Sequence, residues 1–285
     1  MGLTKHYGPV VGLEALDLEV ARGEVFGYLG PNGAGKTTTI RLLLGLLRPT
    51  AGAAEVLGVD ATTDPRRAHE HLAYVAGDVS LWPSLTGTET LHLLARAHGG
   101  TDEAYRDALI ERFEFDPSRR VRTYSKGNRQ KLALIGALMT RADVLILDEP
   151  TAGLDPLMEQ VFRACVREAA ARGQTVFLSS HALSEVEALC GRVAILREGR
   201  LIATGSLAEM RLDGALTLEA TFATSAPDLS DLPGVVDLTR EGTLLRCRVT
   251  GPVGPVLAAL AEAGAIRLVS HEPTLEELFL THYKR

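Results

Sequence analysis

The chain of 285 residues has little of several features that mark common protein classes. Its three cysteines, Cys165, Cys190 and Cys247, are scattered and form no CxxC pair. This excludes a disulfide framework and a cysteine-ligated zinc site, and it predicts reduced thiols in the core or at the surface. No window holds the roughly 18 uncharged apolar residues that a membrane-spanning helix needs. The sequence therefore excludes such a helix.

A surplus of positive charge is also missing. Lys and Arg number 30 against 36 Asp and Glu, a formal net charge of −6. This balance does not favour nucleic-acid binding. The N-terminus has no apolar signal core, so we expect a cytosolic location. With 46% hydrophobic residues and no low-complexity tract or repeat, the length is typical of a globular protein of about two domains.

Short apolar runs alternate with helical patterns over the first two thirds of the chain. This alternation is typical of the α/β class with a mainly parallel sheet. The expected strands span residues 24–29, 144–147, 175–178 and 193–196. The expected helices span residues 37–47, 86–98, 102–113, 125–138, 158–171 and 183–189.

The composition changes after about residue 212. The pattern there predicts strands over 216–222, 235–239, 244–249 and 266–269, a helix over 253–263 and a final helical turn over 274–280. The segment TSAPDLSDLPG, residues 224–234, is rich in turn formers. We therefore expect one domain over residues 1–212 and a small α+β domain over residues 213–285.

A glycine-rich segment, GPNGAGKTT, follows the strand expected at 24–29 and opens a helix. It matches GxxxxGK[ST] in the strand–loop–helix setting that this motif requires. Its backbone N–H groups and the helix N-terminus would hold phosphates, with Lys36 between the β- and γ-phosphates. The alternative is a chance glycine-rich turn. The predicted nucleotide-binding residues are Gly30, Pro31, Asn32, Gly33, Ala34, Gly35, Lys36, Thr37 and Thr38.

Two adjacent carboxylates close the apolar run of LILDEP. Asp148 would hold the water shell of Mg²⁺ together with the hydroxyl of Thr37, and Glu149 would act as the general base toward water. The alternative is an ordinary acidic turn after a strand. No guanine-reading NKxD motif occurs, which favours adenine. ATP and Mg²⁺ are the expected cofactors.

Three further segments follow in order: YSKGNRQK at 124–131, AGLDP at 152–156 and FLSSH at 177–181. Together with the phosphate loop, this set resembles the ATP-binding-cassette (ABC) ATPases from the start of the chain to about residue 212. It is most similar to the ATPase subunits of bacterial drug- and antibiotic-export systems, as is the terminal EPTLEELFL at 272–280. The resemblance implies a P-loop NTPase fold with a mixed, mainly parallel core sheet, a helical subdomain at about 82–140 and a C-terminal α+β accessory domain.

The resemblance also implies roles for single residues. Tyr7 is similar to the aromatic residue that stacks on adenine, the alternative being a packed tyrosine at a strand end. His181, as catalytic partner of Glu149, is similar to the switch histidine that senses the γ-phosphate, the alternative being a structural histidine. The residues expected to act across a dimer interface, on nucleotide bound to the opposite subunit, are Ser125, Gly127, Asn128 and Asp155.

The sequence departs from the family pattern in two places. Tyr124, Lys126 and Asn128 stand where the signature usually has Leu, Gly and Gln. Gly77 stands where the family has a glutamine that faces Mg²⁺ and the membrane partner, and Asp78 is the candidate to replace it through a water. The family also has a few more residues before GLTKHYG, so we expect a short first strand.

The leading hypothesis is an ATP-binding and ATP-hydrolysing subunit of an ABC transporter that exports drugs or other small molecules. It implies a homodimer, or a heterodimer with a second ABC ATPase, on a separate membrane permease docked near residues 77–86. The protein would lie at the inner face of the cell membrane and bind no nucleic acid. Two alternatives are a regulatory subunit with weak turnover and a soluble ABC ATPase outside transport.

Overall fold

The computed structural model describes residues 2–212, 215–274 and 276–277. The chain divides into two compact units, residues 1–204 and 205–285. The predicted domain boundary at residue 212 stays a prediction, since a division by contacts does not test which part folds alone. The helical turn predicted over 274–280 lies largely outside the described residues.

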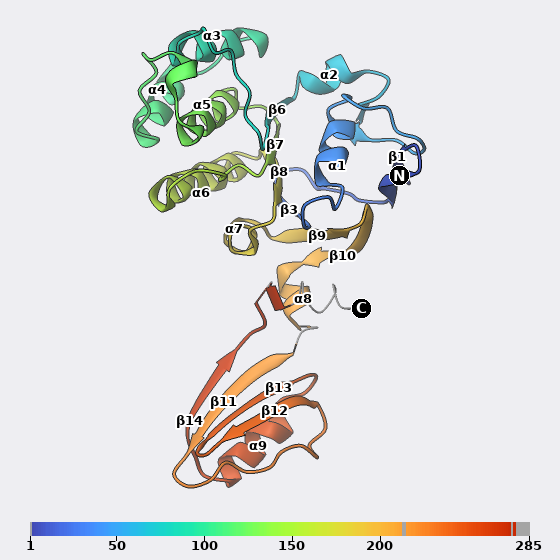
Figure 1. The fold of residues 1–285 in the computed structure, drawn as a ribbon, viewed down its shortest axis with the longest axis vertical. Helices are drawn as coiled ribbons and strands as arrows, with labels where there is room; N and C mark the ends of the chain where they lie inside the picture. The colour runs from blue at the N-terminus through green and yellow to red at the C-terminus, as the bar shows by residue number, and fades with distance from the viewer. Residues whose placement is uncertain (1, 213–214, 275, 278–285) are drawn as a thin grey trace. The chain divides into compact units, whose positions relative to one another are not determined.

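A six-stranded sheet forms the centre of the first unit (Figure 1), in the order β10-β9-β3-β8-β7-β6. The strands from β9 to β6 are parallel to one another. A two-residue turn joins β9 to β10, which only an antiparallel pair allows. The predicted mixed, mainly parallel sheet is therefore confirmed. The strands are β3 (Val25–Leu29), β6 (Leu72–Val75), β7 (Val144–Asp148), β8 (Thr175–Ser180), β9 (Arg192–Arg197) and β10 (Arg200–Ser206).

Helices cover both faces of this sheet (Figure 1): α1 (Lys36–Leu43) lies on one face, and α6 (Pro156–Ala171) and α7 (Leu183–Leu189) lie on the other. On the α1 face, Phe26 and Tyr28 of β3 pack against Phe177 of β8. On the α7 face, a Cβ at Gly27 would lie 2.6 Å from Val186. Glycine at this point lets α7 pack close to the strand.

The first unit also holds short elements. The short first strand was expected from the sequence, and the others were not predicted. The hairpin β1 (Leu3–Tyr7) and β2 (Val10–Leu16) is antiparallel, as is the pair β4 (Glu55–Val56) and β5 (Val59–Asp60). The short helix α2 (Pro65–His69) follows. Leu3, Leu13 and Val56 belong to the hydrophobic core on the α1 face. These strands therefore pack beside the segment that joins β3 to α1.

Three helices pack together beside the sheet in the first unit (Figure 1): α3 (Gly87–Ala97), α4 (Glu103–Arg112) and α5 (Lys126–Leu138). A 3-10 turn, Val121–Thr123, precedes α5. The residue just before each helix caps it, because its side chain accepts a hydrogen bond from a backbone N–H of the first turn. These N-cap residues are Thr86, Asp102 and Ser125. These helices lie within the subdomain expected at about 82–140, whose independence stays a prediction.

The second unit contains α8 (Leu207–Leu212) and a four-stranded antiparallel sheet in the order β12-β13-β11-β14. Helix α9 (Gly254–Glu262) packs on one face, where Leu218, Leu245, Val256 and Leu260 form a core. This is the predicted α+β arrangement. The strands are β11 (Leu216–Phe222), β12 (Val235–Glu241), β13 (Leu244–Val249) and β14 (Ala265–His271).

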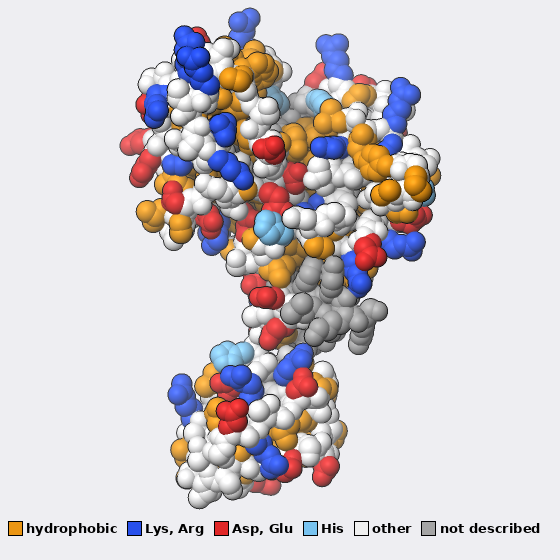
Figure 2. All heavy atoms as spheres, viewed as in Figure 1, with side chains coloured by type: hydrophobic (Ala, Val, Ile, Leu, Met, Phe, Trp, Pro, Cys, Tyr) orange, Lys and Arg blue, Asp and Glu red, His pale blue; other side chains and the backbone are white. Residues whose placement is uncertain are grey.

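Three further observations concern the helices, the surface charges and the cysteines. Within the described ranges, none of the helices has both the length and the apolar character needed to cross a membrane. On the face shown in Figure 2, positive and negative side chains are interspersed, with several Lys and Arg at the outer edge of the helical layer. The three cysteines are buried free thiols.

Candidate nucleotide-binding site

The loop Gly30–Gly35 connects β3 to α1 at the carboxyl edge of the parallel sheet. Gly35 has φ of 107°, and a Cβ on it would lie 2.7 Å from the carbonyl oxygen of Gly12. Gly199, in the β9–β10 turn, lies against the same point, 3.4 Å from that Cβ position. Only glycine fits here, because both the backbone angle and the space exclude a side chain. Pro31, Asn32, Gly33, Ala34, Thr37 and Thr38 complete the loop and the first turn of α1, as predicted.

Lys36 begins α1 and is only 6% exposed. Its ammonium donates to the carbonyl oxygen of Gly30 at 2.6 Å and lies 3.4 Å from Glu149 Oε1. A lysine this buried needs anionic or carbonyl partners to offset the loss of hydration. Its ammonium therefore stands at the loop where the phosphates of a nucleotide would lie.

Thr37 and Asp148 come together from α1 and the end of β7. The Thr37 hydroxyl lies 3.4 Å from Asp148 Oδ2, while Oδ1 accepts a hydrogen bond from the Ser179 hydroxyl. A hydroxyl and a buried carboxylate are the hard oxygen donors that Mg²⁺ prefers. The residues present therefore fit the predicted metal. Ser179 belongs to the FLSSH segment, but only His181 of that segment was predicted to act in the site.

Glu149 follows Asp148 with φ of 48°, an unusual angle for a residue other than glycine. Backbone in this region costs energy and is found mainly where surrounding structure or function requires it. Glu149 Oε2 lies 2.6 Å from His181 Nδ1, and Glu149 N donates to the carbonyl oxygen of Ser179. The predicted base and the predicted histidine thus meet at the ends of β7 and β8.

Tyr7 lies at the end of β1 and exposes 43% of its surface. Its ring lies directly over Gly12, since a Cβ there would be 2.6 Å from Tyr7 Cε2. The carbonyl of Gly12 in turn contacts Gly35. A partly exposed aromatic ring therefore stands beside the phosphate loop, with the Lys5 ammonium 5.4 Å from its centre. Stacking on adenine requires a ring at such a place.

The signature segment opens α5. The Ser125 hydroxyl accepts the backbone N–H of Asn128 at 3.2 Å. A Cβ on Gly127 would lie 2.6 Å from the carbonyl oxygen of Gly153, so the helix start touches the segment after Glu149. Gln130, which the sequence analysis missed, is 1% exposed and donates to the carbonyl oxygen of Pro150 at 2.8 Å. A polar residue on the buried side of a helix was its only signal.

The predicted residue Asp155 and the unusual signature residue Tyr124 both hold local structure. The Asp155 carboxylate caps α6 by accepting the N–H groups of Leu157 and Met158, both at 3.0 Å. Tyr124, at the unusual first signature position, is buried and donates its hydroxyl to the carbonyl oxygen of Asp116 at 2.7 Å. The structure contains one chain, so the expected role of Asp155 across a dimer interface stays a prediction.

Gly77 lies against the carboxylates of the site. A Cβ on it would be 3.3 Å from the carbonyl oxygen of Asp148 and 3.5 Å from Glu149 Cβ. Asp78, the next residue, is exposed. Gly77 therefore occupies the place beside Asp148 that the resemblance implies for the missing glutamine.

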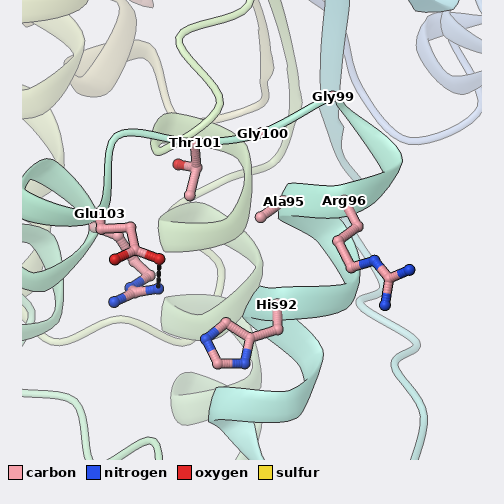
Figure 3. A pocket seen from close by; sticks show the side chains of 8 residues that line it. His92, Ala95, Arg96, Gly99, Gly100, Thr101 and Glu103 are labelled. Atoms are coloured by element: carbon pink, nitrogen blue, oxygen red, sulfur yellow. Dashed lines mark ion pairs between the residues drawn. The ribbon is translucent and has the colours of Figure 1, made fainter.

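A cavity of about 530 Å³ lies elsewhere, between the end of α3 and the start of α4 (Figure 3). Its lining includes His92, Thr101 and Glu103, which pairs with Arg106. None of the phosphate-loop residues lines it. The predicted nucleotide-binding residues thus lie at the carboxyl edge of the sheet, away from this cavity.

The loop, the buried lysine, the paired Thr37 and Asp148 and the following glutamate define a P-loop nucleoside triphosphatase. Residues 13–152 match the family described as "ABC transporter". The chain is 40% identical to the daunorubicin resistance ATP-binding protein DrrA3 of Streptomyces coeruleorubidus, over 98% of this chain and 93% of that protein. It is 34% identical to the Nod factor export ATP-binding protein I of Burkholderia pseudomallei, over 97% and 93% of the two chains.

Solved structures give the same result. A structure titled as the ATP binding subunit of an ABC transporter is 34% identical, with a TM-score of 0.69 over 74% of this chain and 90% of that one. The dimeric cassette MJ0796, bound to ADP and Pi, is 21% identical with a TM-score of 0.66 over 72% and 97%, a likeness of fold. The chain belongs to the ABC transporter family and is an ATP-binding subunit with ATPase activity. This confirms the family, the fold class and the enzyme class predicted from the sequence.

Proposed function

We propose that this chain powers the export of a drug-like or other small molecule through a separate membrane permease. The observation that carries the proposal is the match over nearly the whole chain, including the second unit, to a daunorubicin resistance ATP-binding protein. The relative from Burkholderia is named for export as well. Substrate selection would rest with the permease.

We assign the nucleotide site as follows. Tyr7 stacks on adenine, the loop amides and Lys36 hold the phosphates, and Thr37 and Asp148 hold Mg²⁺. The support is the ring over Gly12, the buried ammonium at the loop and the facing hydroxyl and carboxylate. Mg²⁺, when bound, neutralises charge on the phosphate oxygens.

Hydrolysis follows from the contact between Glu149 and His181. A water lies in line with the γ-phosphorus, and Glu149 takes its proton as the new P–O bond forms. The bond from the γ-phosphorus to the bridging oxygen breaks, and ADP leaves with that oxygen. His181, 2.6 Å from Glu149, orients the carboxylate and contacts the γ-phosphate. Fixed donors and bases of this kind act mainly by positioning and electrostatics.

Two copies of the chain, or one copy with a second ABC ATPase, would close on two ATP molecules. The signature residues Ser125, Gly127 and Asn128 of one subunit then face the γ-phosphate held by the other, with Asp155 at the interface. Ser125 starts α5, so its hydroxyl and the helix N-terminus both favour an anion. Hydrolysis removes the shared γ-phosphate contact, and the dimer opens.

The export proposal places the protein at the inner face of the membrane, held by the permease near residues 77–86. The test is affinity capture of the Glu149→Gln chain with ATP from solubilised native membranes, followed by mass spectrometry. A multi-helix membrane protein in stoichiometric amount is the expected result. Capture of soluble ribosomal, nucleoid or enzyme partners alone would overturn the proposal, and the Lys36→Ala chain is the control for ATP dependence.

A further inference from the structure

A buried carboxyl that the mechanism above does not use lies beside the catalytic pair. Glu185 is on α7 and only 2% exposed. The next residue, Val186, occupies the space left by Gly27, so α7 packs closely on the strand at this point. Burial raises the pKa of Glu185 to about 7. A carboxyl in this position needs partners, because its charged form loses hydration.

One partner fixes the loop that carries His181. The Ser180 hydroxyl donates to Glu185 Oε2 at 2.7 Å and accepts the N–H of Ala182 at 3.0 Å. Ser180 and Ala182 are the residues on either side of His181. A single carboxyl therefore pins the backbone both before and after the histidine.

The histidine depends on this support. Its side chain is 66% exposed, and its ring nitrogen Nδ1 contacts Glu149 Oε2 at 2.6 Å. A side chain so exposed gains little from packing, so its place is set by the backbone that carries it and by this contact. Fixing Ser180 and Ala182 thus fixes the distance between His181 and Glu149.

The surroundings of the Glu185 carboxyl include the segment after Glu149. Oε1 is buried, and within the described residues it has no hydrogen-bond partner that meets ordinary geometry. The Thr151 hydroxyl lies close enough to lower the pKa, while the negative charges of Glu149 and Glu159 raise it. Glu159 also pairs with Arg163 on α6, and the buried thiol of Cys190 follows the last residue of α7. Glu185 therefore stands between the loop of His181 and the segment of Glu149.

We propose that Glu185 is a positioning residue for ATP hydrolysis: through Ser180 it holds His181 in place against Glu149. The inference rests on the proposed roles of His181 and Glu149. Because a protonated and an ionised carboxyl both accept the Ser180 hydrogen bond, the contact persists on either side of neutral pH. Ionisation, however, adds a negative charge near Glu149 and the γ-phosphate.

The sign of the pH effect follows from the raised pKa. The folded protein binds a proton at Glu185 that the unfolded chain releases near its ordinary pKa of 4.5. The contribution of this group to stability is therefore full below that value and is lost as pH rises toward about 7. Above pH 7 the ionised carboxylate faces Glu149, and we expect turnover of the wild-type chain to decline there.

The experiment measures ATP turnover and ATP affinity of the full chain at pH 6 and pH 8. Glu185→Ala and Ser180→Ala both break the chain of hydrogen bonds, and each is expected to lower kcat at least about tenfold with ATP Kd within about twofold. Glu185→Gln keeps the acceptor without the charge. It is expected to match the wild type at pH 6 and to exceed it at pH 8. The control is Glu187→Ala, which removes another carboxyl group from the same helix.

Wild-type turnover in Glu185→Ala would overturn the proposal, and so would a loss of turnover at pH 6 in Glu185→Gln, which keeps the acceptor for Ser180. If Glu185→Ala does not fold, Ser180→Ala remains the test, and wild-type turnover there would overturn the proposal. The Glu149→Gln chain separates the two levels of inference. Full turnover there refutes the assigned base, whereas an inactive Glu149→Gln with an unaffected Glu185→Ala refutes only the role of Glu185.

Discussion

The two units of this chain place their polar side chains in opposite ways. Within the described residues, every buried polar or charged side chain lies in the first unit, among them Lys36, Asp148, Gln130 and Glu185. In the second unit the ion pairs of Arg246 with Glu219 and of Arg248 with Asp237 lie on the solvent-facing side of the sheet.

The difference follows from the two kinds of sheet. Parallel strands end at one edge, so residues far apart in sequence, such as Asp148 and His181, converge there. Antiparallel strands alternate, which sends apolar side chains such as Leu218 to the core under α9 and leaves charged ones on the open face. The parallel sheet therefore brings polar residues together at one edge, whereas the antiparallel sheet spreads charged residues over an open face.

The largest expected effect tests whether the edge of the parallel sheet carries the chemistry. Glu149→Gln should lower ATP turnover about 10²- to 10⁴-fold, because the amide cannot take the proton from water. ATP binding should be retained. Single-turnover assays and equilibrium binding measure the two quantities, with Glu111→Gln, an exposed carboxyl on α4, as the control. Turnover near the wild-type rate would remove the chemistry from this edge of the sheet.

Lys36→Ala should weaken ATP binding about 10- to 100-fold. The loss corresponds to a charge-assisted hydrogen bond of roughly 1.5 to 3 kcal/mol. Titration calorimetry with a non-hydrolysable ATP analogue measures it. Lys131→Ala, which removes a positive charge from α5, should bind normally, and wild-type affinity in Lys36→Ala would contradict the assignment of the loop.

Gly35→Ala should destabilise the first unit by about 1 to 3 kcal/mol, because φ of 107° and the carbonyl oxygen of Gly12 both oppose a methyl group. Gly191→Ala is the matched control, since it has ordinary φ and open space around its Cβ position. Urea unfolding followed by fluorescence compares the two variants. Equal stability would mean that the loop relaxes without cost.

The smallest expected effect is for a substitution on the open face of the sheet in the second unit. Arg246→Gln removes an exposed ion pair with Glu219 in the second unit. Stability should fall by less than about 1 kcal/mol, and ATP turnover should not change. Thermal unfolding and a turnover assay of the same preparation check both. A marked loss of turnover would show that the open face of the second sheet serves the ATP site.

The parts of the site that have their own sequence pattern were predictable. The phosphate loop, LILDEP and FLSSH are short apolar strands followed by polar residues, so both the elements and the edge they share follow from the pattern. The helix Leu183–Leu189 has the predicted bounds. The helix predicted over 37–47 ends earlier, at Leu43, where the chain turns through Gly45 with φ of 61°.

The supporting residues were not predictable. Gln130, Ser179 and Glu185 stand next to other polar residues in the sequence, and only the packing of another element shows that they are buried. The short first strand was expected, but its partner β2 was not predicted because its residues lack clear alternation, and its position is set by contacts with the phosphate loop and the β9–β10 turn. Tertiary contacts decided these features, not local preference.

The meeting of Gly12, Gly35 and Gly199 also has a consequence for biosynthesis. The loop that holds the phosphates is translated early, but one of its walls is the turn at Gly199, more than two thirds of the way along the chain. A nascent chain on the ribosome lacks that wall until the β9–β10 turn has emerged. The nucleotide-binding loop therefore reaches its final shape late in synthesis, and contacts this distant in sequence are slow to form.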